Sequence, residues 1–151
     1  MKVFERSTAL TAWCDLYAKD HTHILTHRTH ALCIPLIIFT AMGFMHQIPG
    51  RYPVFGVPMG WAELLLSLVV FFYAQHDLKL ALVAGPLGAL MCVGARYLSW
   101  PIHLAIALPA WILQLAGHWV WEKNQPSFAT NLVQLLIGPA YFLDGLLHFR
   151  R

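Results

Sequence analysis

The sequence predicts an all-α integral membrane protein, a small bundle of about four transmembrane helices with an interfacial or re-entrant C-terminal helix. Hydrophobic residues make up 58% of the 151 residues and charged residues only 11%, and the mean hydropathy is positive. Such a chain has too little polar side chain to cover a water-soluble sphere, so part of its apolar surface is expected to face lipid. The net charge of +3 suits an anionic membrane surface. No basic cluster is interleaved with aromatic residues, which argues against a nucleic-acid partner.

Four segments with few charged side chains are expected to cross the bilayer in turn. They run roughly from Ala31 to Gln47, Phe55 to Ala74, Leu78 to Leu98 and Pro101 to Trp121, and a crossing helix needs about 20 residues. A fifth apolar segment, Ser127 to Leu143, is broken by the pair Gly138-Pro139 and is expected to dip into the membrane or lie at its interface. Because no linker divides the chain, residues 1–151 are expected to form a single membrane domain.

The basic residues orient this topology. Both termini, the loop after the second span and the loop after the fourth share one side, which holds Lys2, Arg6, Lys19, Arg28, Lys79, Lys123, Arg150 and Arg151, against Arg51 and Arg96 on the other. The positive-inside rule makes the first side cytoplasmic, in the inner membrane if the protein is bacterial or the endoplasmic reticulum if it is eukaryotic. The first span begins beside His30 and the fourth ends near His118, so these residues are expected at one membrane face.

Four histidines stand in the ten residues HTHILTHRTH, directly before the first span. In one continuous helix, at about 100° per residue, His23, His27 and His30 share a face and His21 points the opposite way. Thr26 is a good N-cap, however, and a break there or in the two residues before it makes His21 the end of one helix and His30 an early position of the next. The spacing leaves both backbones open, and each histidine taken alone can be an interfacial polar residue.

A second polar cluster lies in WILQLAGHWVWEKNQP, where Gln114, His118 and Glu122 follow one another at intervals of four. On an α-helix these side chains line one stripe at the point where the fourth span leaves the membrane. A histidine and a carboxylate one turn apart can bind one metal ion together, or the carboxylate can orient the histidine. The alternative is that the pair forms hydrogen bonds with headgroups and loop backbone.

The remaining candidates carry weaker signals. His46, His76, His103 and His148 lack such company and are interpreted as structural, with His103 roughly 22 Å from His118 along the fourth span. Glu63 stays open between a functional and an interfacial carboxylate. The three cysteines are odd in number, which argues against a disulfide framework.

Both clusters carry a resemblance to a known family. Trp13, Tyr17, His21, His30 and Pro35 match its opening pattern, Trp111, Gln114, Gly117, His118, Glu122 and Pro126 match its second block, and Gly138-Pro139 resembles a weaker third. Where the family usually has Asn, and often Pro just upstream, this sequence has Thr26 and Ile24. It resembles the small membrane proteins that include the eukaryotic iron-dependent 2-hydroxy fatty acid α-dioxygenase of phytosphingosine breakdown and many uncharacterised bacterial relatives.

The resemblance implies fatty acid α-oxidation, in which Fe(II) and O2 convert a long-chain 2-hydroxy fatty acid to the acid one carbon shorter plus CO2. Oxidation of the α-carbon to a carboxyl group, together with loss of the original carboxyl carbon as CO2, supplies the four electrons that reduce O2, so neither 2-oxoglutarate nor a nicotinamide is required. The resemblance favours His21 with His30 over the trio of histidines on one helix face. It implies His21, His30 and His118 as catalytic iron ligands, with Glu122 as a fourth ligand or as a residue that orients one, and the acyl chain between the spans.

Two other classes of function remain open on the residues alone. Nine histidines in a small membrane protein also suit a carrier that binds haem or metal, which a Soret band would reveal. A structural membrane protein without catalysis would purify without stoichiometric metal. The oligomeric state is left open in each case.

Overall fold

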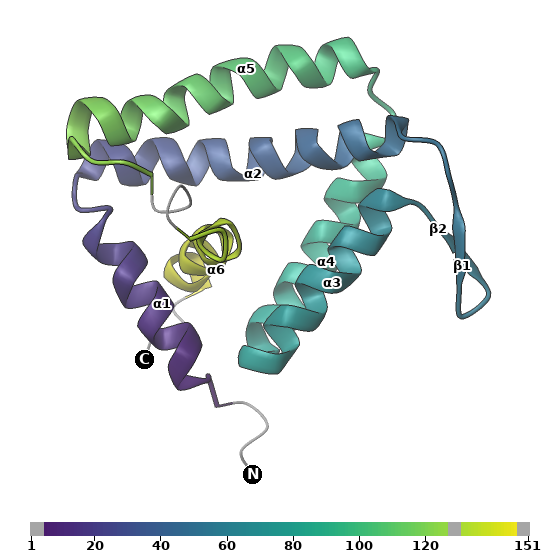
Figure 1. Cartoon of the computed structure of the whole chain (residues 1–151), viewed down its shortest axis with the longest axis horizontal. Coiled ribbons are helices and arrows are strands. Elements are labelled where there is room, and N and C mark those ends of the chain that lie inside the picture. Colours follow the sequence, from purple (N-terminus) through teal and green to yellow (C-terminus); the bar gives the residue numbers. More distant parts are fainter. Residues whose placement is uncertain (1–4, 127–130, 148–151) are drawn as a thin grey trace.

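The computed structural model describes residues 5–126 and 131–147, and within these ranges the chain is mostly helical (Figure 1). The elements in order are α1 (Thr8–Lys19), α2 (Ile24–Gln47), β1 (Tyr52–Val54), β2 (Val57–Met59), α3 (Trp61–His76), α4 (Leu78–Ala95), α5 (Trp100–Ala116), the π-helix η1 (Gly117–Glu122) and α6 (Gln134–Leu147). Lys2, His148, Arg150 and Arg151, which the sequence analysis used, lie outside the described residues.

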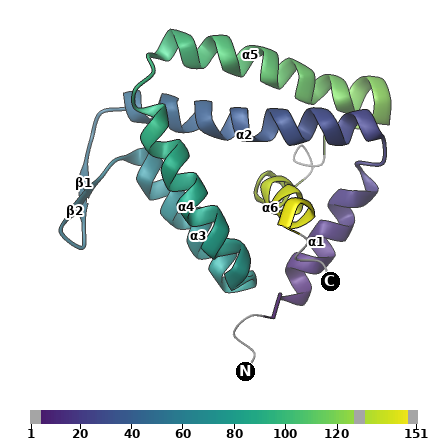
Figure 2. The ribbon, with the colours of Figure 1, turned by 180° about the vertical axis from the view of Figure 1, so that it is seen from behind.

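Two helix pairs make up the frame of the molecule. Helices α2 and α5 run antiparallel and side by side, and the α3–α4 hairpin packs across one end of α2 at a steep inclination (Figures 1 and 2). Helix α1 descends from the other end of α2, and α6 lies between α1 and the α3–α4 hairpin. The end of α5 and the start of α2 are therefore neighbours, and this corner of the fold holds both the opening histidine stretch and His118.

Within residues 5–126 and 131–147, three helices are long and apolar enough to cross a membrane, namely α2, α4 and the continuous segment Trp100–Glu122 formed by α5 and η1. Many large apolar side chains on these helices are exposed, among them Leu82, Leu90 and Ile112 at 60% or more. Exposed apolar surface of this extent on long helices is typical of contact with lipid. These features agree with an all-α membrane protein.

The prediction of a second span from Phe55 to Ala74 is wrong for the residues before Trp61. Residues 52–59 form an antiparallel hairpin, with Phe55 and Gly56 at positive φ in its turn, and α3 begins only at Trp61. A tight turn of this kind cannot continue into a helix. The helix starts where Glu63 accepts a hydrogen bond from the backbone N–H of Gly60 at 2.9 Å, and its 16 residues make it shorter than the three spanning candidates.

Other boundaries differ in ways that matter for the site. The first span begins at Ile24 instead of Ala31, and its N-cap is His23, whose Nδ1 accepts from the backbone N–H of Leu25, instead of Thr26. At the C-terminal end, α6 passes through Pro139 without a break. Proline costs a helix one hydrogen bond, and burial of the flanking residues Ile137 and Ala140 holds this helix together.

A buried ion pair joins the N-terminal segment to the rest of the fold. Arg6 donates to Asp77, at the α3–α4 turn, and to Asp144 of α6, both of which are almost fully buried. These carboxylates raise the pKa of Arg6, with Asp144 the larger influence. Next to it, the backbone N–H of Ser7 donates to the carbonyl of His76 at 2.7 Å. The start of α1 is thus fixed against the turn that the sequence analysis places on the same side of the membrane.

Candidate metal centre

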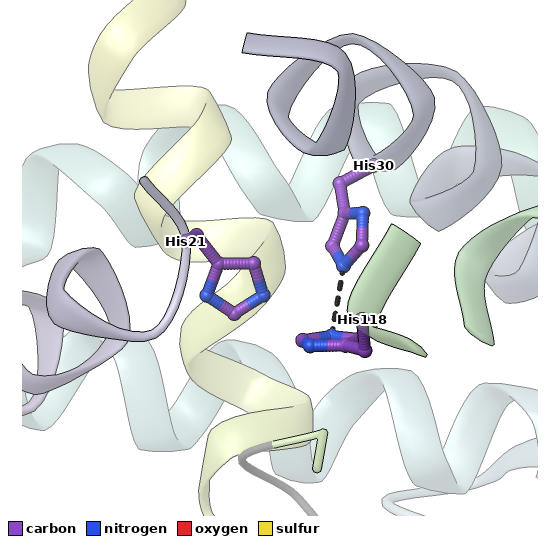
Figure 3. A group of neighbouring side chains, drawn as sticks. All are labelled: His21, His30 and His118. Atoms are coloured by element: carbon purple, nitrogen blue, oxygen red, sulfur yellow. Dashed lines mark hydrogen bonds between the residues drawn. The ribbon is translucent and has the colours of Figure 1, made fainter. Parts of the chain in front are cut away.

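Three imidazoles from distant parts of the chain meet inside the protein (Figure 3). His21 follows α1, His30 lies in the second turn of α2, and His118 lies in η1. Each offers one ring nitrogen within 4.8 Å of the others, and none of the three residues is more than 2% exposed. We call the group of His21, His30 and His118 the histidine triad.

His21 is placed by the end of α1. The helix stops at Lys19, and the ring of His21 then folds back to stack on Tyr17 at a centroid distance of 3.8 Å. Its Nδ1 lies 2.7 Å from the carbonyl oxygen of Tyr17. Since a carbonyl only accepts, Nδ1 carries the proton and Nε2 keeps its lone pair. Burial lowers the pKa of His21 to about 4, so this ring is neutral at pH 7.

His30 is placed by the early start of α2 and by a close helix contact. The chain breaks before Ile24, so His21 and His30 lie on different elements, as in the second of the two backbones that the sequence left open. A Cβ added at Gly117 would stand 3.2 Å from Cε1 of His30, so glycine allows η1 to approach α2 closely. The Nδ1 of His30 is buried and has no hydrogen-bond partner among the described residues.

His118 is held by a residue that the sequence analysis did not single out. Its Nδ1 lies 3.2 Å from Oδ1 of Asn124, whose Nδ2 donates to the carbonyl of Asp20 at 3.2 Å. Asn124 therefore joins the loop after η1 to the end of α1 and leaves Nε2 of His118 directed at the triad. The contact with Asp20 spans 104 positions, so no local pattern around Asn124 could have indicated it.

The donor set fits a divalent transition metal. The Nε2 atoms of His30 and His118 lie 3.1 Å apart (Figure 3), which is close to the roughly 3.0 Å between adjacent ligands whose bonds to one ion are about 2.1 Å long. The hydrogen bonds of His21 and His118 leave Nε2 as the lone pair on each ring. Neutral imidazole suits iron, zinc, copper and nickel, so the chemistry of the donors restricts the metal without selecting one.

Glu122 lies outside the triad. Because Gly117–Glu122 is a π-helix, in which hydrogen bonds run from i to i+5, Glu122 is not one α-helical turn beyond His118. Its carboxylate instead accepts from the hydroxyl of Thr22 at 2.9 Å and from the backbone N–H of His23 at 2.7 Å. A carboxylate at this position also faces the positive N-terminal end of α2. The geometry therefore joins Glu122 to the segment that carries His21.

The other histidines of the opening stretch do not join the triad. His23 is exposed and stacks with Trp121, and His27 lies against Tyr141 and Phe142. The face that a continuous helix would have given to His23, His27 and His30 is not assembled, because the chain starts α2 afresh at Ile24.

Three of the histidines interpreted as structural make hydrogen bonds away from the triad. The Nε2 atoms of His46 and His103 lie 2.9 and 3.0 Å from the carbonyls of Cys92 and Ala95, and Nδ1 of His76 lies 2.8 Å from Oγ of Ser7. The prediction that His46 has no company is wrong, since it lies near Glu63 and Cys92 in a second, less buried group. Glu63 itself pairs with Arg96 and caps α3.

Among the described residues, one cavity adjoins the triad and a second lies next to the first. The smaller, of about 80 Å³, is lined by His21, His118 and two buried amides, those of Gln114 and Gln134. The larger, of about 630 Å³, lies between α2, α4 and α6 and is lined almost entirely by apolar side chains, from His27 at one end of its α2 wall to Leu87 and Met91 on α4. Ile34, Ile38 and Pro139 line both cavities, so these residues lie between the small space that contains the two triad rings and the large apolar one.

The fold and the triad define a class: a helical protein with membrane-spanning candidates and a buried three-histidine centre beside an apolar cavity. The family model described as "2-hydroxy-palmitic acid dioxygenase Mpo1-like" matches residues 7–150, and the chain belongs to this family.

One curated relative adds detail to this assignment. The chain is 29% identical over 118 residues to the 2-hydroxy-palmitic acid dioxygenase MPO1 of Saccharomyces cerevisiae, covering 76% of this chain and 65% of the yeast protein. The chain thus spans a little less than two thirds of the length of that relative. No solved structure matches the chain.

Proposed function

We propose that this protein is an Fe(II)-dependent dioxygenase that converts a long-chain 2-hydroxy fatty acid and O2 to the fatty acid one carbon shorter and CO2. The observation that carries the proposal is the histidine triad, with two Nε2 atoms 3.1 Å apart, in a chain of the Mpo1-like family. Consistent with this reaction, the name of the yeast relative includes 2-hydroxy-palmitic acid as the substrate of that enzyme.

In this proposal His21, His30 and His118 hold the metal through Nε2. The carbonyl of Tyr17 and the side-chain amide of Asn124 fix the rings of His21 and His118, so that the lone pairs converge before any ion arrives. Glu122 acts as an orienting residue, since its carboxylate holds the backbone on the C-terminal side of His21. Fe(II), when bound, supplies the redox chemistry that reduces O2.

The larger cavity is our proposed site for the acyl chain. Its volume of about 630 Å³ lies within the roughly 300–1,000 Å³ that small-molecule sites occupy. Its apolar lining favours a long chain, because each buried CH2 contributes about 0.8 kcal/mol. In this proposal the acyl chain runs from the triad past Ile34, Ile38 and Pro139, which line both cavities, toward α4.

The membrane arrangement is part of the same proposal. Residues 1–151 are taken as one membrane domain in which α2, α3, α4 and the α5–η1 segment cross the bilayer in turn, so that the start of α2 and the end of the α5–η1 segment meet near the cytoplasmic face, where the triad lies. The exposed apolar side chains of these helices support the insertion. The bilayer would also supply the substrate, since a long-chain acid partitions into lipid.

The spacing of His30 and His118 does not favour this pair as the two ligands of a haem iron. Two axial histidines on opposite sides of one iron would need their nitrogens about 4 Å apart, twice a bond length of about 2.0 Å. The observed 3.1 Å between Nε2 of His30 and Nε2 of His118 is shorter than that. Adjacent ligation of a bare ion fits this distance better.

The test is a reconstitution in lipid. Protein loaded anaerobically with Fe(II) and then given 2-hydroxypalmitate and O2 should release the acid one carbon shorter, without a stoichiometric reductant. Palmitate should not react, because it lacks the oxidised α-carbon. If iron-loaded protein of confirmed stoichiometry consumes no O2 with any long-chain 2-hydroxy acid, the dioxygenase proposal should be abandoned.

A further inference from the structure

Two buried glutamine side chains beside the triad have amide atoms without a hydrogen-bond partner among the described residues. Gln114 of α5 is 7% exposed and Gln134 of α6 is 3% exposed, and both line the small cavity together with His21 and His118. The Oε1 of Gln114 and both amide atoms of Gln134 have no partner among the described residues. A buried polar group without a partner is costly, so these atoms indicate a ligand or a solvent molecule that satisfies them.

Most of the unpartnered atoms are hydrogen-bond acceptors. Two of the three are carbonyl oxygens, which only accept, and the third is an amide nitrogen, which donates. Exchanging O and N in the assignment of Gln134 leaves this set unchanged, because both of its atoms are free. The cavity therefore needs at least one hydrogen-bond donor from whatever occupies it.

We propose that Oε1 of Gln114 and Oε1 of Gln134 share the single proton of the substrate's 2-hydroxyl group in a bifurcated hydrogen bond and so select 2-hydroxy acids over unhydroxylated ones. This inference rests on the proposed function and names its specificity-determining residues. At neutral pH the carboxylate of a fatty acid has no donor, and the 2-hydroxyl is the only donor in the head of the substrate. The amide nitrogen of Gln134 donates to the carboxylate of the same head.

The selectivity follows because an unhydroxylated acid does not satisfy the buried oxygen atoms of the two glutamines. Palmitate in the same place would leave the Oε1 atoms of Gln114 and Gln134 buried and unpaired. Sites that are built to bind a hydroxyl reject the analogue that lacks it far more strongly than apolar pockets reject an extra methylene. The two amides therefore add a preference for the hydroxyl to any that the metal provides.

The experiment measures binding without turnover. Metal-loaded protein in lipid nanodiscs, kept free of O2, is titrated with 2-hydroxypalmitate and with palmitate, and the ratio of the two dissociation constants is compared among wild type, Gln114→Leu and Gln134→Leu. Loss of one hydrogen bond should reduce the preference for the hydroxylated acid by about tenfold in each variant. Gln47→Leu, an exposed position at the far end of α2, should leave the ratio unchanged.

Thermal stability separates recognition from a structural role. Leucine has nearly the volume of glutamine and removes the unpartnered amide, so both variants should unfold at the same temperature as wild type or higher when no acid is bound. Metal content must equal that of wild type. A lower unfolding temperature, an unchanged ratio at equal metal content, or no binding of either acid to wild type would overturn the inference; an unchanged ratio is also the result expected if water alone fills the cavity.

The outcome is distinguishable from failure of the proposed function. If the hydroxyl preference depends on the glutamines but the iron-loaded protein never consumes O2, the dioxygenase proposal fails and the recognition site stands. If both variants turn over 2-hydroxypalmitate with the wild-type preference, the recognition site fails and the dioxygenase stands.

Discussion

The two ends of helix α2 carry histidines in opposite chemical states. Near its start, His30 faces His118 and His21, and two of these rings bind a hydrogen-bond acceptor through Nδ1 and turn Nε2 inward. Near its end, His46 and the neighbouring His103 donate through Nε2 to backbone carbonyls. A nitrogen that donates its proton to a carbonyl has no lone pair for a metal. His21 and His118 therefore keep Nε2 available for a metal, whereas His46 and His103 use Nε2 for a hydrogen bond to the backbone.

Removal of a triad imidazole should have the largest effect. His30→Ala and His118→Ala should each lose most of the bound metal and with it the activity, because each deletes one of three converging nitrogens. His103→Ala should keep the metal, since its ring bonds to Ala95 at the other end of α2. Metal analysis of membrane-inserted protein checks this, and full stoichiometry in both triad variants would disprove the site.

The reverse experiment perturbs the opposite end. A Cβ added at Gly43 would lie 2.1 Å from the ring of His103, which is fully buried, so Gly43→Ala must push α2 and α5 apart. Overpacking of this kind costs about 1–3 kcal/mol. We expect a lower unfolding temperature in detergent with metal stoichiometry unchanged. Loss of metal without loss of stability would mean that the two ends are coupled in a way that their contacts do not explain.

The same contrast shows which parts of the fold the sequence could predict. Apolar segments located the helices well, because charge-free runs are a property of residues close together in the chain. The points at which a helix begins, ends or changes its geometry were harder to predict. The hairpin around Phe55 depends on positive φ values, and the π-helix at Gly117–Glu122 adds a residue to a turn without any change in hydropathy.

Prediction of the site had a similar limit. The histidines were visible as residue types, and the resemblance chose His21 over His23, but the contacts that orient the rings cross the whole chain. Asn124 reaches Asp20, and the unpartnered amide of Gln134 reaches the cavity from α6. Such pairings depend on tertiary packing, which a single sequence without an alignment does not reveal.

A substitution at Asn124 tests whether the hydrogen bond to Nδ1 is what leaves Nε2 of His118 available for a metal. Asn124→Leu keeps the size of the side chain but leaves Nδ1 of His118 without its acceptor at 3.2 Å, so the ring is free to rotate or to exchange tautomers. Changes to residues that orient metal ligands typically cost about 10- to 100-fold in metal affinity. A competition titration with a chelator measures this, with Gln125→Leu, at the adjacent exposed position, as the control. An affinity equal to wild type would show that the ring is oriented by packing alone.

The smallest effect is expected at Glu122, and it decides between the two roles that the sequence left open. Glu122→Gln retains an oxygen for the N–H of His23 or the hydroxyl of Thr22 but removes the charge. If the carboxylate only holds this segment, metal affinity should fall less than about tenfold, since hydrogen bonds to charged groups contribute roughly 1.5–3 kcal/mol and neutral ones about 1 kcal/mol. If Glu122 instead moves to bind the metal as a fourth ligand, the loss should approach that of His30→Ala. The chelator titration therefore decides whether Glu122 is an orienting residue like Asn124 or a metal ligand like the imidazoles.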